Sequence, residues 1–124
     1  MTATEKLTAF CDSWTRKDYK KMYQNCQLSW KSKHSHAALK KLIPVKIQSF
    51  EILEEREVSP FVKSISLKVQ IQGGQRELCG RMLQEIEPYA PSDKGEWGVN
   101  PISLLRGLYS EVELTREIVK KEKS

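Results

Sequence analysis

The spacing of apolar side chains changes near residue 45, from the period of helices to the period of strands. Alternate positions are apolar through residues 65–71, namely Ile65, Leu67, Val69 and Ile71. Such alternation is typical of a strand with one buried face, and Gly73-Gly74 supplies the positive φ values of a tight hairpin turn. We therefore expect a long antiparallel hairpin over residues 65–88, whose apolar face needs a cover.

Amphipathic helices in the first third of the chain are the expected cover. Residues 3–15 carry one apolar stripe of Leu7, Phe10, Cys11 and Trp14, and Thr2 or Thr4 can cap this helix. Asp18 is placed to cap a second helix, in which Tyr19, Met22, Tyr23 and Cys26 repeat the spacing. Residues 27–35 lose the pattern and are expected to form a loop. Ser35 is placed to cap a third helix over 36–43, which Pro44 ends.

The strands that flank the hairpin show two irregularities. Val45 and Ile47 share one parity and Phe50 and Ile52 the other, so we expect a β-bulge near residues 48–49. Ser59-Pro60 marks the turn into the hairpin. A last strand is expected over 96–105, at a sheet edge or bulged at Pro101, because proline cannot donate to the ladder.

Residues 108–123 are expected to form a further helix. Leu108, Tyr109, Val112 and Val119 make one stripe, whereas Leu114 and Ile118 lie on the opposite side. A helix that is apolar on two sides is either wedged within the fold or in contact with a second chain.

Composition is that of an ordinary globular protein, and we expect one domain over residues 1–124. The net charge of +5 comes from 21 basic and 16 acidic residues. The lysines are scattered without interleaved aromatic residues, so we expect solvated faces and no nucleic-acid partner. No apolar run approaches the roughly 20 residues of a membrane span, and we expect the amphipathic N-terminal stretch to be a helix of the fold and not a secretory signal. A cytoplasmic protein without membrane contact is expected.

Three cysteines, at positions 11, 26 and 79, do not form a disulfide framework. They lie too far apart in sequence to read as a zinc site, and each falls in an apolar pattern. We expect free thiols in the core, and no metal or cofactor.

The order of elements resembles the nuclear transport factor 2-like superfamily, which includes the SnoaL-like cyclases, ketosteroid isomerase and scytalone dehydratase. The resemblance rests on Phe10, Trp14, Asp18, Tyr19, Met22 and Tyr23, and on the strand patterns at 61–71, 78–86 and 97–104. The closing stretch EWGVNPISLL is also similar to small uncharacterised bacterial members. The resemblance covers residues 4–105 and implies a cone-shaped α+β fold, with N-terminal helices packed on a strongly curved antiparallel sheet. The helix over 108–123 is a departure from it.

The resemblance further implies an apolar cavity inside the cone, where enzymes of the superfamily desolvate acids and bases. The acid–base set of those enzymes is incomplete here. No aspartate begins a strand, the segment 45–52 offers only Glu51, and His34 and His36 lie in a loop rich in lysine and serine, where we expect them to be exposed. No catalytic residue is therefore assigned.

The sequence favours a non-catalytic domain that binds a small apolar molecule or another protein, as a homodimer through the sheet or the C-terminal helix. The residues expected to line its pocket are Trp14, Tyr19, Tyr23, Trp30, Cys79, Arg81 and Trp97. The alternative is an isomerase, cyclase or dehydratase that uses Tyr23 with Glu51 or Cys79. Arg81 shares a face with Cys79 and could favour a thiolate, but a buried structural thiol is the preferred reading. Gly80 is expected to admit an aromatic side chain from a neighbouring strand.

Overall fold

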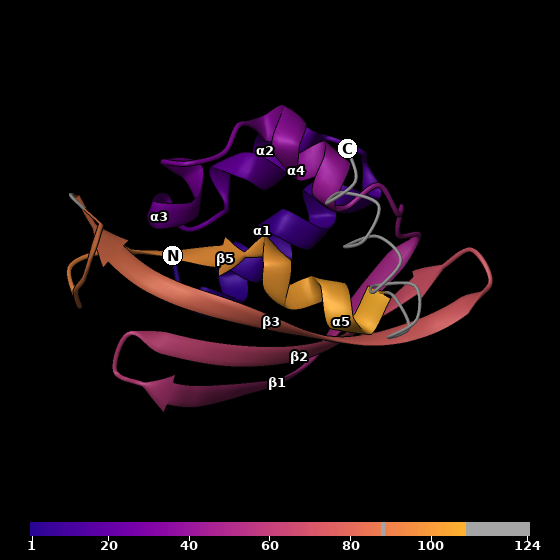
Figure 1. The fold of residues 1–124 in the computed structure, drawn as a ribbon. Coiled ribbons are helices and arrows are strands. Elements are labelled where there is room, and N and C mark those ends of the chain that lie inside the picture. Colours follow the sequence, from indigo (N-terminus) through magenta and orange to yellow (C-terminus); the bar gives the residue numbers. More distant parts are fainter. Residues whose placement is uncertain (88, 109–124) are drawn as a thin grey trace.

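The structure, a computed structural model, describes residues 1–87 and 89–108. In this part of the chain, helices cover one face of an open, antiparallel sheet of five strands (Figure 1). The helices are α1 (Ala3–Thr15), α2 (Tyr19–Gln24), α3 (Leu28–Lys31), α4 (His36–Leu42), the 3₁₀-helix η1 (Pro101–Leu104) and α5 (Leu105–Leu108). The strands are β1 (Ser49–Ser59), β2 (Val62–Ile71), β3 (Gly74–Ile86), β4 (Ala90–Pro91) and β5 (Glu96–Asn100). The α+β class is thus confirmed.

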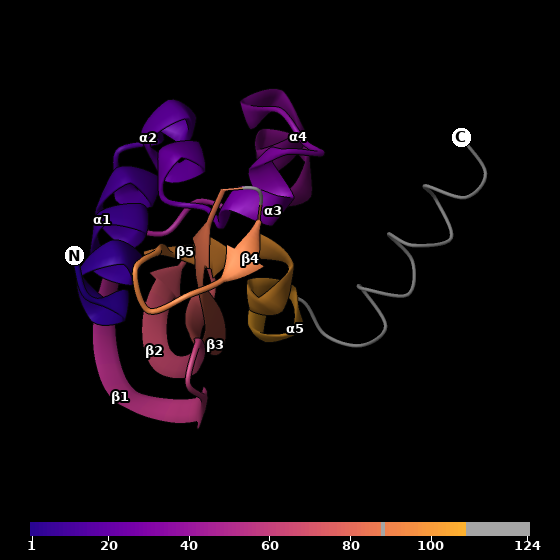
Figure 2. The same cartoon turned by 90° about the vertical axis from the view of Figure 1, so that its left-hand side faces the viewer.

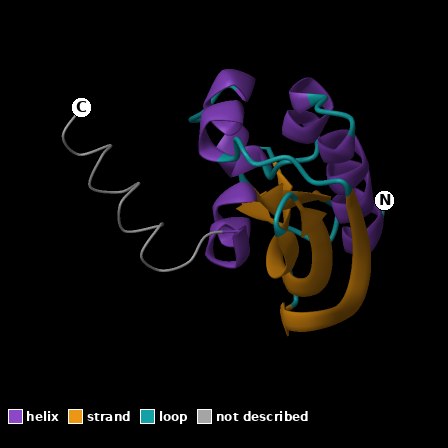
Figure 3. Ribbon diagram, turned by 90° about the vertical axis from the view of Figure 1, so that its right-hand side faces the viewer, coloured by secondary structure: helices purple, strands orange, loops and turns teal. Residues whose placement is uncertain are grey.

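Local capping sets the starts of the N-terminal helices. Thr2 and Glu5 form a capping box at the start of α1, in which the Thr2 hydroxyl accepts from the Glu5 amide at 3.1 Å. The Asp18 carboxylate accepts from the amide of Lys21, and the Ser35 hydroxyl from the amide of Ala38. These helix starts agree with the sequence prediction. Figures 2 and 3 show the helices on one side of the strands, which curve beneath them.

The predicted loop over 27–35 contains a short helix instead. Helix α3 is a single turn that packs on β3 and buries Trp30, which is 6% exposed. One apolar residue among polar ones gives no helical periodicity, so the sequence pattern could not reveal this turn.

Strands β2 and β3 form the predicted hairpin in regular register, with Ile71 opposite Gly74. The two-residue turn is therefore Gln72-Gly73, one position earlier than the predicted glycine pair. Gly73 and Gly74 both have positive φ, +100° and +140°. The four alternate apolar positions of β2 are buried, as predicted.

The predicted bulge near residues 48–49 is wrong. Strand pairing starts only at Ser49, and the register shifts occur between Ile52 and Glu54 and between Glu57 and Ser59. The stretch before β1 is a linker that packs on α1, where the Val45 carbonyl accepts from the Trp14 indole at 2.8 Å. The change of parity therefore reflects the end of a linker and the start of a strand.

The predicted last strand over 96–105 ends at Asn100. The Asn100 side chain accepts from the amide of Ile102 at 3.1 Å and caps η1, whose first residue is Pro101. Proline has no N–H for the ladder but suits the first position of a helix. The chain therefore turns from strand to helix at the position where an edge or bulge was expected.

Strand β5 lies between β3 and the segment that follows α2. The Val99 amide donates to the carbonyl of Asn25, and the Gln27 amide donates to the carbonyl of Val99, both at 2.9 Å. A Cβ on Gly98 would lie 2.6 Å from the Gln27 nitrogen, so only glycine permits this approach without displacement.

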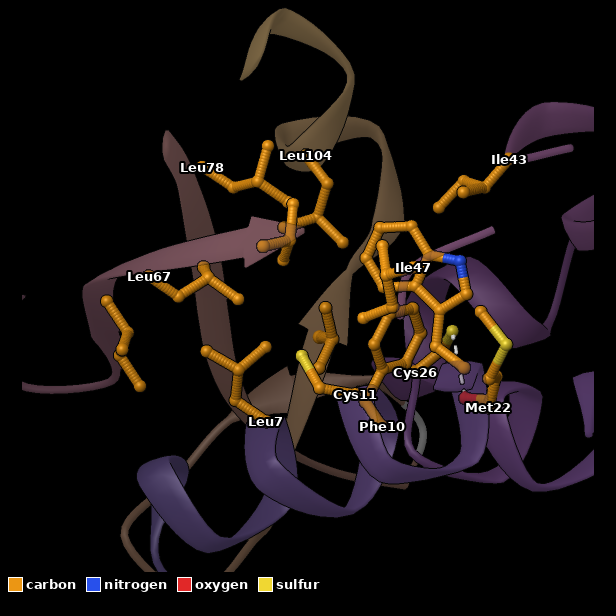
Figure 4. Close-up of a cluster of buried hydrophobic side chains, with 14 of the residues drawn as sticks. Leu7, Phe10, Cys11, Met22, Cys26, Ile43, Ile47, Leu67, Leu78 and Leu104 are labelled. Atoms are coloured by element: carbon orange, nitrogen blue, oxygen red, sulfur yellow. Dashed lines mark hydrogen bonds between the residues drawn. The ribbon is translucent and has the colours of Figure 1, made fainter. Parts of the chain in front are cut away.

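A single cluster of buried side chains joins the helices to the sheet (Figure 4). Its largest members with less than 2% exposure are Trp14, Phe10, Leu7, Met22, Leu39, Ile43, Ile65, Leu67, Leu78, Met82, Leu104 and Val69. Gly80 faces this cluster, but a Cβ added there would meet the aliphatic side chains of Leu7 and Leu104 at 3.4–3.5 Å, not an aromatic ring.

Of the predicted helix over 108–123, only Leu108, the last residue of α5, lies in the described part. Leu114 and Ile118 lie outside the described residues, and the single domain over 1–124 stays a prediction.

Candidate functional site

The structure places the seven predicted pocket residues in several parts of the molecule. Trp14 belongs to the core, where it is 1% exposed and has its hydrogen-bond partner in Val45. Trp97 lies near the start of β5, and the Nζ of Lys63 is 5.1 Å from the centroid of its ring. Lys63 also pairs with Glu55 at 3.3 Å. These contacts give both tryptophans a structural role within the fold.

Tyr23 and Trp30 belong to an aromatic cluster between α2, α3 and the start of α4. The Tyr23 hydroxyl lies 2.9 Å from the Lys31 carbonyl and 2.7 Å from that of His34, so it can donate to either. The exposed His34 ring stacks on Trp30 with centroids 4.5 Å apart, and His36 meets the edge of Tyr23. The buried Trp30 N–H has no acceptor among the described residues.

Cys79 is exposed, contrary to the expected core thiol, whereas Cys11 and Cys26 are buried. It lies on the face of the sheet opposite the helices, because its neighbours Leu78 and Gly80 take the buried positions of β3. Arg81 is exposed at the same parity. Alternation alone left open which face of β3 was the buried one, since both contain an apolar residue beside charged ones.

A cavity of about 240 Å³, called the outer groove below, lies on this face. It is lined by Glu54, Arg56, Ser64, Ser66, Glu77 and Cys79. Its charged residues are of both signs, so the groove offers neither an anion nor a cation a uniformly complementary surface. Glu51 is exposed and lies opposite Lys68 in the register of β1 with β2, while Tyr23 lies on the helical side of the sheet. The groups of the enzymatic alternative are therefore not gathered in one place.

Sequence reasoning missed Glu85, a carboxylate that is only 2% exposed. One Glu85 oxygen accepts from the amide and the hydroxyl of Ser29, at 3.3 and 3.2 Å. Glu85 thereby supplies acceptors at the first turn of α3, whose own N-cap residue makes no side-chain hydrogen bond. These two hydrogen bonds give the buried Glu85 a structural role.

The larger cavity, about 620 Å³, lies in the helical layer and is called the lysine pocket. It is lined by Lys17, Tyr19, Ala37, Lys40, Lys41, Pro44 and Lys46. These residues come from the end of α1, the start of α2, one face of α4 and the linker to β1. Helices α2 and α4 form the part of the helical layer farthest from the strands (Figures 1 and 2).

Tyr19, one of the predicted pocket residues, provides the aromatic wall of the lysine pocket. Its hydroxyl donates to the carbonyl of Ile43 at 3.3 Å, which holds the ring against the end of α4. The Nζ of Lys40 lies 5.9 Å from the centroid of the ring. Burial raises the pKa of Tyr19, so its hydroxyl stays a neutral donor at physiological pH.

Positive charge concentrates on this pocket without compensation. Among the lining residues that the structure describes there is no aspartate or glutamate, and none of the four lysines is in the described ion pairs. The Lys46 side chain is a neighbour of that of Lys17, and the interaction with Lys17 and its like charge lowers the pKa of Lys46. Like charges in contact favour the neutral form or a bound anion.

Lys17 has φ of 61°, in the left-handed region. It is the C′ residue of a Schellman motif that ends α1, in which the Lys17 amide donates to Trp14 and the Asp18 amide to Ser13. Glycine is the usual residue at this position, and a side chain there costs roughly 1 kcal/mol. A lysine at the end of a predicted helix is the one sequence signal that could have drawn attention to this pocket.

Comparison with known proteins gives no assignment: no protein-family model and no curated protein matches the chain. Within residues 1–87 and 89–108, no helix is both long and apolar enough to cross a bilayer. In the same residues, no group of three or more His, Cys, Asp or Glu side chains could hold a metal ion.

Proposed function

We propose that this protein is a non-catalytic, ligand-binding domain of nuclear transport factor 2-like fold. The order of elements supports the fold: capped helices precede a long antiparallel hairpin, and the helices pack on one face of the sheet. The dispersal of Tyr23, Glu51 and Cys79 over two sides of the sheet supports binding over catalysis.

The ligand binds in the lysine pocket, and this pocket is the observation that carries the proposal. Its volume of about 620 Å³ falls within the roughly 300–1,000 Å³ of small-molecule sites. Tyr19, Ala37 and Pro44 offer apolar surface, while the four lysines bring positive charge. These properties fit a small amphipathic anion better than the purely apolar ligand expected from the sequence.

Filling the pocket tests this function. Ala37 is exposed on α4, so tryptophan at this position occupies the pocket without disturbing the core. We expect the amphipathic anion 8-anilinonaphthalene-1-sulfonate to bind the native protein with enhanced fluorescence, and Ala37→Trp to abolish most of that signal. Ala90→Trp, an equivalent change on exposed β4, is the control and should leave the signal unchanged. Equal fluorescence titrations of Ala37→Trp and the native protein would overturn the assignment of the site.

We also propose that the protein forms a homodimer, through the sheet or through residues 108–123. The support is the apolar character of both sides of the 108–123 sequence. The exposed face of the sheet is more polar, with Ser66, Lys68 and Glu77 among its residues.

A further inference from the structure

We infer that the lysine pocket recognises a phosphate group, and that Lys17 and Lys46 hold it as the head of a small aromatic or aliphatic phosphomonoester. This inference rests on the proposed function, because it names the ligand class of the same pocket.

The ammonium groups of Lys17 and Lys46, which line the same pocket, define the place for the charged head. Lys17 follows the end of α1, and Lys46 lies in the linker before β1. No described acidic residue lines the pocket to separate them. A phosphomonoester carries a charge of about −1.5 to −2 at pH 7 and three acceptor oxygens, so it can bridge two ammonium groups. A carboxylate carries a single charge and compensates only one of them.

The backbone at Lys17 gives the second argument. The Schellman motif uses only backbone N–H and C=O groups, so glycine would end α1 in the same way without the side-chain strain. The Lys17 side chain takes part in none of the described hydrogen bonds or ion pairs that hold the fold together. A strained residue whose side chain contributes to a cavity rather than to packing indicates a binding role.

The remaining walls fit the ester group. The Tyr19 ring is held by Ile43, and Ala37 and Pro44 extend its apolar surface. Lys40, near the ring, and Lys41 add positive charge around the head group. Lysine acts on phosphate as a point charge and requires no fixed bidentate geometry, which suits a pocket that contains no arginine.

Isothermal titration calorimetry at low ionic strength tests the inference with phenyl phosphate, benzoate and inorganic phosphate. Phenyl phosphate should bind about tenfold more tightly than benzoate, which has the ring but a single charge. Inorganic phosphate should bind more weakly than phenyl phosphate, since it leaves Tyr19 uncovered. Equal affinities for phenyl phosphate and benzoate would overturn the phosphate assignment, and equal affinities for the two phosphates would overturn the ester.

Two variants locate the head group. Lys17→Gly and Lys46→Ala should each weaken phenyl phosphate binding by about tenfold, whereas Lys68→Ala, which removes the same charge from exposed β2, should leave it unchanged. Lys17→Gly should melt no lower than the native protein, because glycine suits the left-handed position, so lost binding cannot be ascribed to unfolding. Unchanged affinity in both lysine variants contradicts the inference.

The two proposals fail in different ways. If Ala37→Trp abolishes the fluorescence of 8-anilinonaphthalene-1-sulfonate but phenyl phosphate does not bind, the pocket is a site and only the phosphate inference is wrong. If Ala37→Trp has no effect on either probe, the proposed function itself is wrong.

Discussion

Burial separates the three cysteines into two kinds. Cys11 and Cys26 lie within the core, and burial raises the pKa of each thiol to about 12. A thiol whose pKa is raised stays protonated at pH 8 and is a poor nucleophile there. Cys79 is exposed on the sheet, with its sulfur 2.7 Å from the hydroxyl of Ser64.

We therefore predict that iodoacetamide at pH 8 modifies only Cys79 in the folded protein. Mass spectrometry of the intact protein should show one adduct under native conditions and three after denaturation in urea. The variant Cys79→Ser should show none when folded. Rapid native labelling of Cys11 or Cys26 would contradict the burial of these residues.

Single residues also show where local patterns were informative. Asp18 and Ser35 were placed correctly as caps, because capping depends only on the residues within one helical turn. The exposure of Cys79 could not be predicted in this way. A side chain on a strand is buried or exposed according to what packs on that face, which is a property of other parts of the chain.

At the scale of elements, close backbone approaches fix the position of β5. Gly98 meets the backbone of Cys26 and Gln27, and no side chain fits between them. Gly80 faces the core from β3, but a Cβ added there would meet only leucine side chains, at ordinary van der Waals distances. These two glycines form a matched pair for a stability experiment.

Gly98→Ala should lower the free energy of unfolding by about 1–3 kcal/mol or more, because the added methyl forces the Asn25–Gln27 segment away from β5. Gly80→Ala should cost less, since the added methyl would make ordinary van der Waals contact with Leu7 and Leu104. Urea denaturation of both variants, followed by circular dichroism, measures the difference. A smaller loss for Gly98→Ala than for Gly80→Ala would show that β5 is packed differently.

Elements with strong periodicity were predicted well, and those without it were not. The bounds of α1 and the pairing of β2 with β3 follow from repeated apolar spacing over ten or more residues. Helix α3 and the turn from β5 into η1 are short, and their stability comes from Trp30, Glu85 and the core around Leu104. Such elements depend on tertiary contacts and leave little local signal.

At the scale of the whole molecule, the proposed homodimer is open to a direct test. If residues 108–123 form the interface, a charge at Leu114 or Ile118 should dissociate the dimer, whereas if the sheet forms it, Ser66→Arg should do so. Sedimentation velocity of the native chain, Leu114→Asp and Ser66→Arg distinguishes these cases. A native chain that stays monomeric at high concentration removes the dimer altogether.

The sequence by itself determined the caps of α2 and α4, the pairing of β2 with β3 and the apolar face of β2, because these follow from neighbours a few positions away. It did not determine the lysine pocket. Lys17, Lys40, Lys41 and Lys46 lie in three separate segments and appear scattered along the chain. Only the packing of α2 against α1 and α4, together with the course of the linker before β1, brings them around Tyr19. Electrostatic repulsion acts through space, so the positive charge of this site exists only in the folded chain.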